Sequence, residues 1–515
     1  MFTFRLFSVA ALLLESITTA ALTPYTGPAP NLPAQRAPFS YGALATGGSS
    51  ANASSVFLVD NMPDLRVALT LPFPRTVYIR GNISGLEITS AANGSTYADC
   101  QWFIDNGGAK RFNFTRYLMS LNQTYMDGVA AESAKNGTME GMNAGEFMDL
   151  LKRMNGWRAQ AQNSQKEWSS INVKSDLTLV GLDGEAYLNG ISLIFNTVNN
   201  VISTTSSRDT ENQTKSLPVR NLKLTPPRDC FPAPETATSW NARYDALSLV
   251  TSTNFWIDGN TLLDGPAPVA PVPVIWDYAV DPYDGLMDCE DGTDNVTFSH
   301  NIVSNHAKSI LLGGGLRERE RDVGKMRFMF FGNLFENSDS RNPLMRFGTF
   351  YLVNNLFAHA GESVEPYRRK LQYNLGVYTE SNVLVGGNVF LNQAENRTRI
   401  FSFSNLSNAA LPARLCVPAA ETDLPEVLHE LAVPGSSLNR VAIDLKQDGL
   451  AEFRRTVTAN HSSTAEGSLL VSCNGFTAQP VPTTFATSEE VERYVRQEAG
   501  QRAVGMGSYP TKQRE

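Results

Sequence analysis

The stretches RFMFFGNLF (327–335) and TFYLVNNLF (349–357) decide the fold. Each is an alternating apolar run that leads into an asparagine and then a second short apolar run. The same form recurs in NFWIDGNTL (254–262), NVTFSHNIV (295–303) and NVLVGGNVF (382–390). The recurring asparagines are Asn260, Asn301, Asn333, Asn355 and Asn388, at spacings of 41, 32, 22 and 33 residues.

This repeat predicts a coil of short strands. Alternation with a period of two indicates β-strands, and recurrence at roughly 20 to 50 residues indicates a solenoid or another repeat array. A propeller blade needs four strands, which the shortest spacing of 22 residues hardly holds. A helical repeat would show a different period. We therefore predict an all-β fold, a right-handed single-stranded parallel β-helix, with its asparagines stacked at equivalent turns.

Two segments outside the repeat predict helices. NAGEFMDLLKRMNG (143–156) begins with an asparagine N-cap and has a glutamate at the capping-box position. TSEEVERYVRQEAG (487–500) pairs a threonine with a glutamate in the same way. The expected organisation is a signal peptide at 1–20, a β-helix domain at 21–480 with a partly helical insertion at 85–170, and a C-terminal helical tail at 481–515.

The N-terminus predicts export from the cell. Arg5 precedes a short apolar run, Leu6–Leu14, and small residues follow, which is typical of a secretory signal peptide. The run is too short to span a bilayer, and no other long apolar run predicts a membrane anchor. Many Asn-x-Ser/Thr acceptors also favour a secreted glycoprotein. The five cysteines leave an odd one; Cys416 and Cys473 are a plausible pair, although the connectivity stays open.

Two fixed cations, Arg341 and Arg346, bracket a proline at the start of a predicted strand in SRNPLMRFGTF (340–350). The chain as a whole has a net charge of −8, which argues against a nucleic-acid partner. An acidic partner must therefore be met by a local group of cations such as this one.

Acidic residues lie upstream, in or beside successive repeats. They are Asp245, Asp284 and Asp288, and Lys308 follows them. Converging carboxylate oxygens are the ligands that Ca²⁺ prefers. In a straight strand Asp284 and Asp288 would be about 13 Å apart, so the chain must bend between them, which Gly285 permits. The alternative is a solvated acidic loop without a metal.

Taken in order, these motifs resemble the pectate lyase superfamily, polysaccharide lyase family 1. The resemblance covers roughly residues 40–84 and 172–395. The segment from Cys100 to Asn163 resembles an insertion of some fungal secreted members. The pieces that carry the resemblance include RTVYIRGNISG (75–85), LTLVGLDGEAYLNGISLIFNTVNNV (177–201), NFWIDGNTLLDG (254–265), YDGLMDCEDGTDNVTFSHNIVSNHAKSILLGG (283–314) and RNPLMRFGTFYLVNNLF (341–357).

The resemblance implies a role for each site residue. The family motif RxPxxR places a catalytic arginine at Arg341 and a substrate-binding arginine at Arg346. Lys308 matches the lysine that binds the substrate carboxylate. The implied calcium ligands are Asp245, Asp284 and Asp288.

The implied reaction is a β-elimination on polygalacturonate. A base removes the proton on C5, next to the C6 carboxylate, and the oxygen on C4 leaves. Ca²⁺ and a clamp of cations neutralise the carboxylate and stabilise the developing charge. An arginine base is unusual, because arginine is normally protonated, so a cationic, dehydrated surround and alkaline conditions must help.

The chain departs from the family pattern at three places. Gly259 stands where members usually have a histidine, and we expect the change to affect packing more than chemistry. Arg243 stands where some members have a further calcium aspartate, which could weaken metal binding. About 17 polar residues, 202–218, interrupt what is normally one continuous rung.

Three functions compete. The first is a calcium-dependent pectate lyase on de-esterified pectin, and the second is a pectin lyase on methylated pectin, against which the retained Asp284 and Asp288 argue. The third is a non-catalytic β-helix that binds cell-wall polysaccharide. A polygalacturonase would need GHG and RIK motifs that the chain lacks. The expected partner is pectin or polygalacturonate, with no nucleic acid and no membrane, and with the chain acting as a monomer.

Overall fold

The computed structural model describes residues 22–27, 38–89, 94–182, 184–201, 219–236, 239–264, 274–275, 278–279, 281–360, 371–392, 399–403, 414–416, 435–457 and 476–501. The predicted signal peptide, the polar segment 202–218 and Cys473 lie outside these ranges. The expected pairing of Cys473 with Cys416 therefore stays a prediction.

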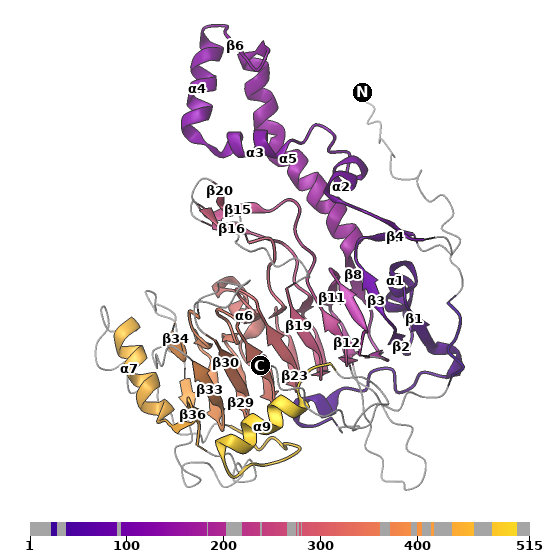
Figure 1. Ribbon diagram of the computed structural model, residues 1–515, viewed down its shortest axis with the longest axis vertical. Helices are drawn as coiled ribbons and strands as arrows, with labels where there is room; N and C mark the ends of the chain where they lie inside the picture. The colour runs from indigo at the N-terminus through magenta and orange to yellow at the C-terminus, as the bar shows by residue number, and fades with distance from the viewer. Residues whose placement is uncertain are drawn as a thin grey trace, which may run out of the picture.

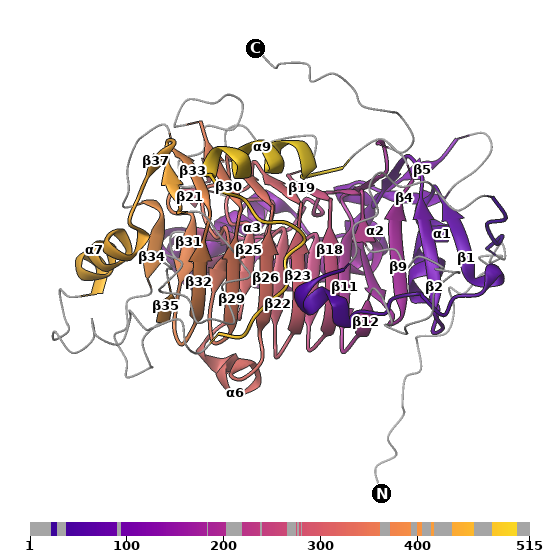
Figure 2. The ribbon, with the colours of Figure 1, turned by 90° about the horizontal axis from the view of Figure 1, so that it is seen from below.

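Within the described residues the chain winds into a coil whose turns stack into three parallel sheets. In Figure 2 the strands lie side by side along the body of the molecule and run across it. Each turn contributes one strand to each sheet in most of the coil. The predicted parallel β-helix is confirmed.

The eleven-stranded sheet contains the alternating strands of the sequence repeat. Its strands are β1 (Val56–Val59), β2 (Arg75–Ile79), β9 (Leu177–Gly181), β12 (Asn199–Val201), β13 (Val219–Arg220), β18 (Thr253–Asp258), β23 (Asp294–Ser299), β26 (Arg327–Phe331), β29 (Thr349–Val353), β32 (Asn382–Gly386) and β35 (Arg414–Cys416).

The ten-stranded sheet follows directly after the asparagines of the repeat. Its strands are β3 (Asn82–Ser84), β10 (Tyr187–Asn189), β14 (Lys223–Leu224), β19 (Thr261–Leu263), β24 (Ile302–Ser304), β27 (Leu334–Glu336), β30 (Leu356–His359), β33 (Val389–Asn392), β36 (Ser437–Leu438) and β37 (Val441–Ala442). The last pair is antiparallel and ends the sheet.

The eight-stranded sheet carries the candidate site. Its strands are β8 (Ser170–Val173), β11 (Ser192–Asn196), β17 (Leu247–Val250), β22 (Met287–Glu290), β25 (Ile310–Leu312), β28 (Leu344–Met345), β31 (Leu375–Val377) and β34 (Phe401–Phe403). Four small hairpins lie outside the three sheets in the described ranges: β4–β5 (Glu87–Thr89, Thr96–Tyr97), β6–β7 (Thr138–Met139, Met142–Asn143), β15–β16 (Ala233–Thr236, Ser239–Asn241) and β20–β21 (Val274–Ile275, Tyr278–Ala279).

The recurring asparagines form a buried ladder, as the repeat predicts. The backbone N–H of Asn301 donates to Oδ1 of Asn333 at 2.9 Å, and that of Asn333 donates to Oδ1 of Asn355 at 3.0 Å. The same bond joins Asn260 to Asn301 and Asn355 to Asn388, each at 2.9 Å. All five side chains are fully buried. Because a buried amide without partners is costly, this ladder fixes the register of successive turns.

The insertion stands beyond the coils at the top of Figure 1. Its helices are α2 (Cys100–Asn106), α3 (Phe114–Leu121), α4 (Gln123–Ala134) and α5 (Ala144–Ser169). The predicted N-cap Asn143 is confirmed, since its side chain accepts the N–H groups of Gly145 and Glu146. A disulfide between Cys100 and Cys230 ties the insertion to the coil, and α5 continues directly into β8.

The remaining helices cover the coil. They are the 3₁₀ turns η1 (Ser40–Leu44), η2 (Ala53–Ser55) and η3 (Leu316–Glu318), and the helices α1 (Met62–Thr70), α6 (Arg319–Asp322), α7 (Leu445–Val457) and α9 (Ser488–Glu498). The predicted C-terminal helix is confirmed as α9, which begins at its N-cap Thr487 and packs Val491 and Val495 against the ten-stranded sheet. The sequence did not predict α7, which packs against β34. None of the described helices is both long and apolar enough to cross a membrane.

Candidate active site

Side chains alternate between the core and the outer face of the eight-stranded sheet. On β22, Met287 and Cys289 are buried in the core, whereas Asp288 and Glu290 lie half-buried on the outer face. The register sets Asp288 beside Ser248 of β17 on one side and Leu311 of β25 on the other. Chemistry-bearing residues of successive turns therefore line up along one face.

Two predicted calcium ligands converge beside Gly285. A methyl group placed on this glycine would lie 2.4 Å from Oδ1 of Asp288 and 2.9 Å from Oδ1 of Asp245. Asp245 accepts hydrogen bonds from the Gly285 N–H at 2.9 Å and the Ser248 hydroxyl at 2.8 Å. Oδ1 of Asp288 is buried and has no hydrogen-bond partner among the described residues. Two carboxylate oxygens thus share one small region, and one of them is unsatisfied.

Like charges in this region oppose ionisation. Burial and the charge of Asp284 raise the pKa of Asp245 to about 7. Burial and the charges of Asp245 and Asp284 raise the pKa of Asp288 well above its usual value, and Arg341 partly offsets the rise. A bound cation would relieve this repulsion.

The third predicted ligand, Asp284, forms an ion pair with Lys308. Its Oδ1 accepts from Nζ of Lys308 at 2.8 Å, and the same ammonium donates to Oδ1 of Asn241 at 2.9 Å. In the part of the chain that the structure describes, no group of three or more His, Cys, Asp or Glu side chains is arranged to hold a metal ion. The predicted triad is therefore a converging pair with a third carboxylate held by lysine.

A buried histidine fixes the backbone at Asp284. Nε2 of His306 lies 2.5 Å from the carbonyl oxygen of Asp284, and Nδ1 lies 2.5 Å from Oδ1 of Asp264. His306 is fully buried. The contact with buried His306 thus holds the backbone of the turn that contains Asp284 and Gly285.

The two predicted arginines differ in how they are held. Arg346 donates to the carbonyl oxygens of Gly313 and Gly314 at 2.7 Å and 2.6 Å, and its guanidinium lies 5.3 Å from the ring centre of Tyr378. Burial and the charge of Arg341 lower the pKa of Arg346. The half-buried Arg341 makes no side-chain hydrogen bond or ion pair to any described residue. Its φ is +58°, in the left-handed region, as for Phe347, Asn354 and other residues at turns of the coil.

A cavity of about 380 Å³ lies over the converging carboxylates. It is lined by residues of four successive turns, among them all three predicted calcium ligands, and also by Lys166 and Arg243. Sequence reasoning missed Lys166, because it lies in the insertion and belongs to no motif. It also missed Tyr378, which contacts Arg346 from the residue just after the neighbouring strand β31.

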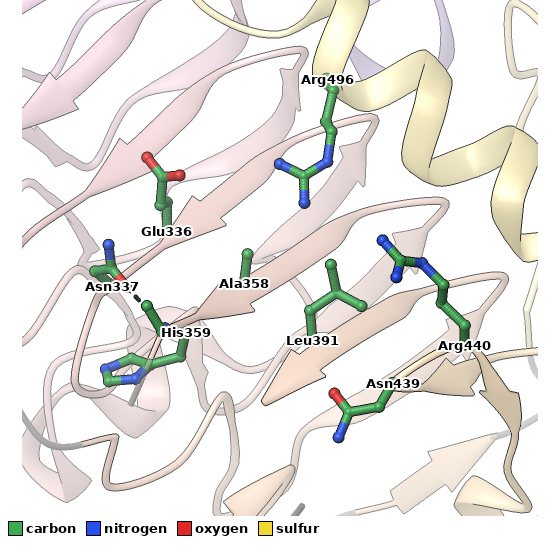
Figure 3. Close-up of a pocket in the computed structure, with 9 residues that line it drawn as sticks. Glu336, Asn337, Ala358, His359, Leu391, Asn439, Arg440 and Arg496 are labelled. Carbon is green, nitrogen blue, oxygen red and sulfur yellow. Dashed lines mark hydrogen bonds between the residues drawn. The ribbon is translucent and has the colours of Figure 1, made fainter. Parts of the chain in front are cut away.

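A second cavity, of about 340 Å³, lies on the ten-stranded sheet beside α9 and contains none of the predicted site residues (Figure 3). Its two arginines, Arg440 and Arg496, both pair with Glu492, at 3.1 Å and 3.0 Å. Each of these arginines therefore has an ion-pair partner within the protein.

Gly259 lies at the end of β18, outside the cavity over the carboxylates. Its φ is +67°, and its N–H donates to the carbonyl oxygen of Ser299 at 3.0 Å. The backbone of Gly500, just past α9, lies 3.9 Å from where a Cβ would stand. The expected effect of Gly259 on packing stays a prediction.

Residues 151–411 match a family model described as pectate lyase. The chain belongs to the pectate lyase family. Pectate lyase E of Dickeya chrysanthemi is 31% identical over 229 residues, which cover 44% of this chain and 54% of that enzyme. Pectate lyase of Bacillus subtilis (strain 168) is 25% identical and covers 67% of this chain and 74% of its own. Pectate lyase A of Emericella nidulans is 28% identical over 49% of this chain and 65% of its own.

Among solved structures, the thermostable pectate lyase PL 47 matches with a TM-score of 0.67 at 21% identity, covering 91% of this chain and 98% of that one. A pectate lyase bound to a hexasaccharide matches with a TM-score of 0.66 at 21% identity, covering 92% and 99%. These structures share the fold. The chain spans only 54% to 64% of several Dickeya pectate lyases that it matches.

Proposed function

We propose that the protein is a calcium-dependent pectate lyase that cleaves de-esterified pectin by β-elimination and releases unsaturated oligogalacturonates. Family membership supports the reaction class. The observation that carries the proposal is the pair of carboxylates, Asp245 and Asp288, converging on one point in a cavity of the eight-stranded sheet. Two negative carboxylates would repel an anionic substrate. A cation bound between them and the substrate would allow the substrate to bind.

Arg341 is the proposed base. It takes the proton from C5 of the galacturonate, the electrons of that bond form a double bond between C4 and C5, and the C4–O bond breaks. The departing sugar oxygen takes a proton from solvent. Arginine is normally protonated, so only the deprotonated side chain can accept the proton. Its lack of a bond to the described residues leaves its guanidinium available for this step.

Arg346 and Lys308 are proposed to bind substrate carboxylates. Arg346 is rigid, because two carbonyl oxygens and the ring of Tyr378 hold it. Lys308 shares its ammonium between Asp284 and Asn241, so substrate would join or replace these partners. Fixed donors that are already oriented cost little reorganisation in the transition state.

The residues present fit a calcium ion. Oxygen ligands are what Ca²⁺ prefers, and the unsatisfied Oδ1 of Asp288 faces the same point as Oδ1 of Asp245. Asp284, which directly precedes Gly285 and lines the same cavity, would be a further ligand if Lys308 turned to the substrate. Calcium, when bound, would neutralise the C6 carboxylate and make the C5 proton more acidic.

The predicted signal peptide at 1–20 and the glycosylation acceptors support secretion as a glycoprotein acting on plant cell walls. We also propose that the protein acts as a monomer in the extracellular space.

Ultraviolet absorbance of the unsaturated product tests the proposal. We expect product from polygalacturonate and little product from highly methylated pectin. Product only from methylated pectin would instead identify a pectin lyase. Binding of polygalacturonate without product, by correctly folded protein, would identify a non-catalytic wall-binding protein and overturn the proposal.

A further inference from the structure

A second group of cations lines the cavity on the side of the insertion. Lys166 lies on the last turn of α5, four residues before β8 begins at Ser170, and Arg243 lies two residues before Asp245. Both are exposed and both line the cavity that contains the converging carboxylates. Neither belongs to the motifs that place Arg341, Arg346 and Lys308.

The insertion holds these cations in place. Arg243 donates to Oδ1 of Asn163 on α5 at 2.6 Å. The hydroxyl of the neighbouring Tyr244 donates to the carbonyl oxygen of Gln162, also on α5, at 2.8 Å. Because α5 runs without a break into β8, Lys166 is fixed relative to the same sheet.

The two cations share the cavity with the carboxylates of Asp245, Asp284, Asp288 and Glu290, but none of these acids bonds to them directly. Neither Lys166 nor Arg243 forms an ion pair with a described residue. Asp229 lies within electrostatic reach of Arg243, but its oxygens already accept from Gln162 and from the backbone of Phe231. Lys166 and Arg243 line the same cavity, and burial together with the charge of Arg243 lowers the pKa of Lys166.

The sheet order gives the spacing. β8, β11, β17 and β22 are successive neighbours, followed by β25 and β28. Strands are about 4.8 Å apart, so β8 lies about 10 Å from β17. Along the coil axis Lys166 comes first, just before β8, and Arg243 and Asp245 follow together just before β17. Asp288 on β22 is next, and Lys308 and Arg346 lie beyond it, beside β25 and β28 and outside the lining of the cavity.

We propose that Lys166 and Arg243 form a subsite for the carboxylate of a galacturonate unit that lies along the same chain, on the insertion side of the carboxylate pair. This subsite rests on the proposed function, since the ligand is the same polyuronate. An extended polyanion lying along the coil axis would meet fixed cations on both sides of the acidic centre. The insertion thereby selects long, de-esterified substrate.

The test compares binding with turnover. Binding of hexagalacturonate is measured by calorimetry in an Arg341→Ala background, which leaves the ligand uncleaved, with and without Lys166→Met and Arg243→Met together. We expect the Kd to rise at least about tenfold, because hydrogen bonds to charged groups are lost. With Arg341 intact, the double variant should raise the KM for polygalacturonate to a similar degree and leave kcat nearly unchanged.

Two further variants serve as controls. Arg153→Met removes an exposed cation of the same helix outside the cavity and should leave Kd and KM unchanged. Arg243→Lys keeps a cation at this position, so its affinity for hexagalacturonate should stay close to that of the protein with Arg243. An unchanged Kd in the double variant would overturn the subsite, even if wild-type protein forms product. A weakened Kd together with no product from wild-type protein would keep the subsite and remove the proposed reaction.

Discussion

The cavity on the eight-stranded sheet and the cavity beside α9 contain the same kinds of side chain in opposite arrangements. Beside α9, Arg440 and Arg496 share the carboxylate of Glu492. On the eight-stranded sheet, Asp245 and Asp288 face each other and the arginine nearby, Arg341, has no partner among the described residues. Compensated charges contribute modestly to stability, whereas uncompensated ones cost stability and are typical of functional sites. This difference supports the proposal that the reaction takes place at the carboxylates of the first cavity.

Removing the unpaired cation should give the largest effect. Arg341→Ala should lower kcat on polygalacturonate by about 10³-fold, since general-base catalysis contributes about 10² to 10⁴. The melting temperature should hardly change, because no bond of the side chain to described residues is lost. Arg440→Ala, in the cavity beside α9, is the matched control and should keep full turnover. Turnover retained by Arg341→Ala would assign the base elsewhere.

Removing the cation that holds Asp284 should weaken substrate binding. Lys308→Met should raise the KM for polygalacturonate about tenfold or more, with a smaller change in kcat. Initial rates over a range of substrate concentrations separate the two constants. If kcat alone fell, Lys308 would act in the chemical step rather than in binding.

Replacing Asp288, in the cavity on the eight-stranded sheet, by its amide should stabilise the protein. Asp288→Asn removes one of two converging charges, so in the presence of a chelator the free energy of unfolding should rise by about 1 kcal/mol. Calcium should raise the melting temperature of the wild-type protein more than that of the variant. A variant less stable than wild type under chelation would mean that the carboxylate is already compensated.

The corresponding replacement beside α9, Glu492→Gln, should lower the free energy of unfolding, and its effect should be the smallest of the four. Burial works against the ionised form of Glu492, but hydrogen bonds from Arg440 and Arg496 outweigh it and lower the pKa. The ionised form therefore stabilises the fold above the unfolded pKa of about 4.3, and this contribution is lost as the pH falls through the lower folded value. Glu492→Gln should cost about 0.5 to 1 kcal/mol at neutral pH. Denaturation curves should converge with wild type at strongly acidic pH, and turnover should not change.

The sequence predicted those features that repeat or that carry a motif. The asparagine ladder could be predicted because each turn needs the same buried amide, so Asn333 and Asn355 recur in register with their neighbours. Arg341, Arg346 and Lys308 could be singled out from the family resemblance, and their roles stay predictions. Helix caps such as Asn143 and Thr487 could be predicted because capping is local.

Features that depend on distant contacts could not be predicted. Lys166 reaches the cavity only because α5 ends at β8, and nothing local to Lys166 indicates this. The disulfide joins Cys100 to Cys230 across 130 residues, and spacing does not reveal such a pairing. Asp284 pairs with Lys308 because the next turn of the coil brings the lysine there, so the three predicted ligands could not be seen to divide into a pair and a single residue.

The most direct test of the central claim is product formation from polygalacturonate during a calcium titration that starts from chelated wild-type protein. We predict no product at the start, a rate that rises with calcium, and a shift to higher calcium for Asp288→Asn. A full rate in the presence of chelator, equal in wild type and Asp288→Asn, would contradict the account.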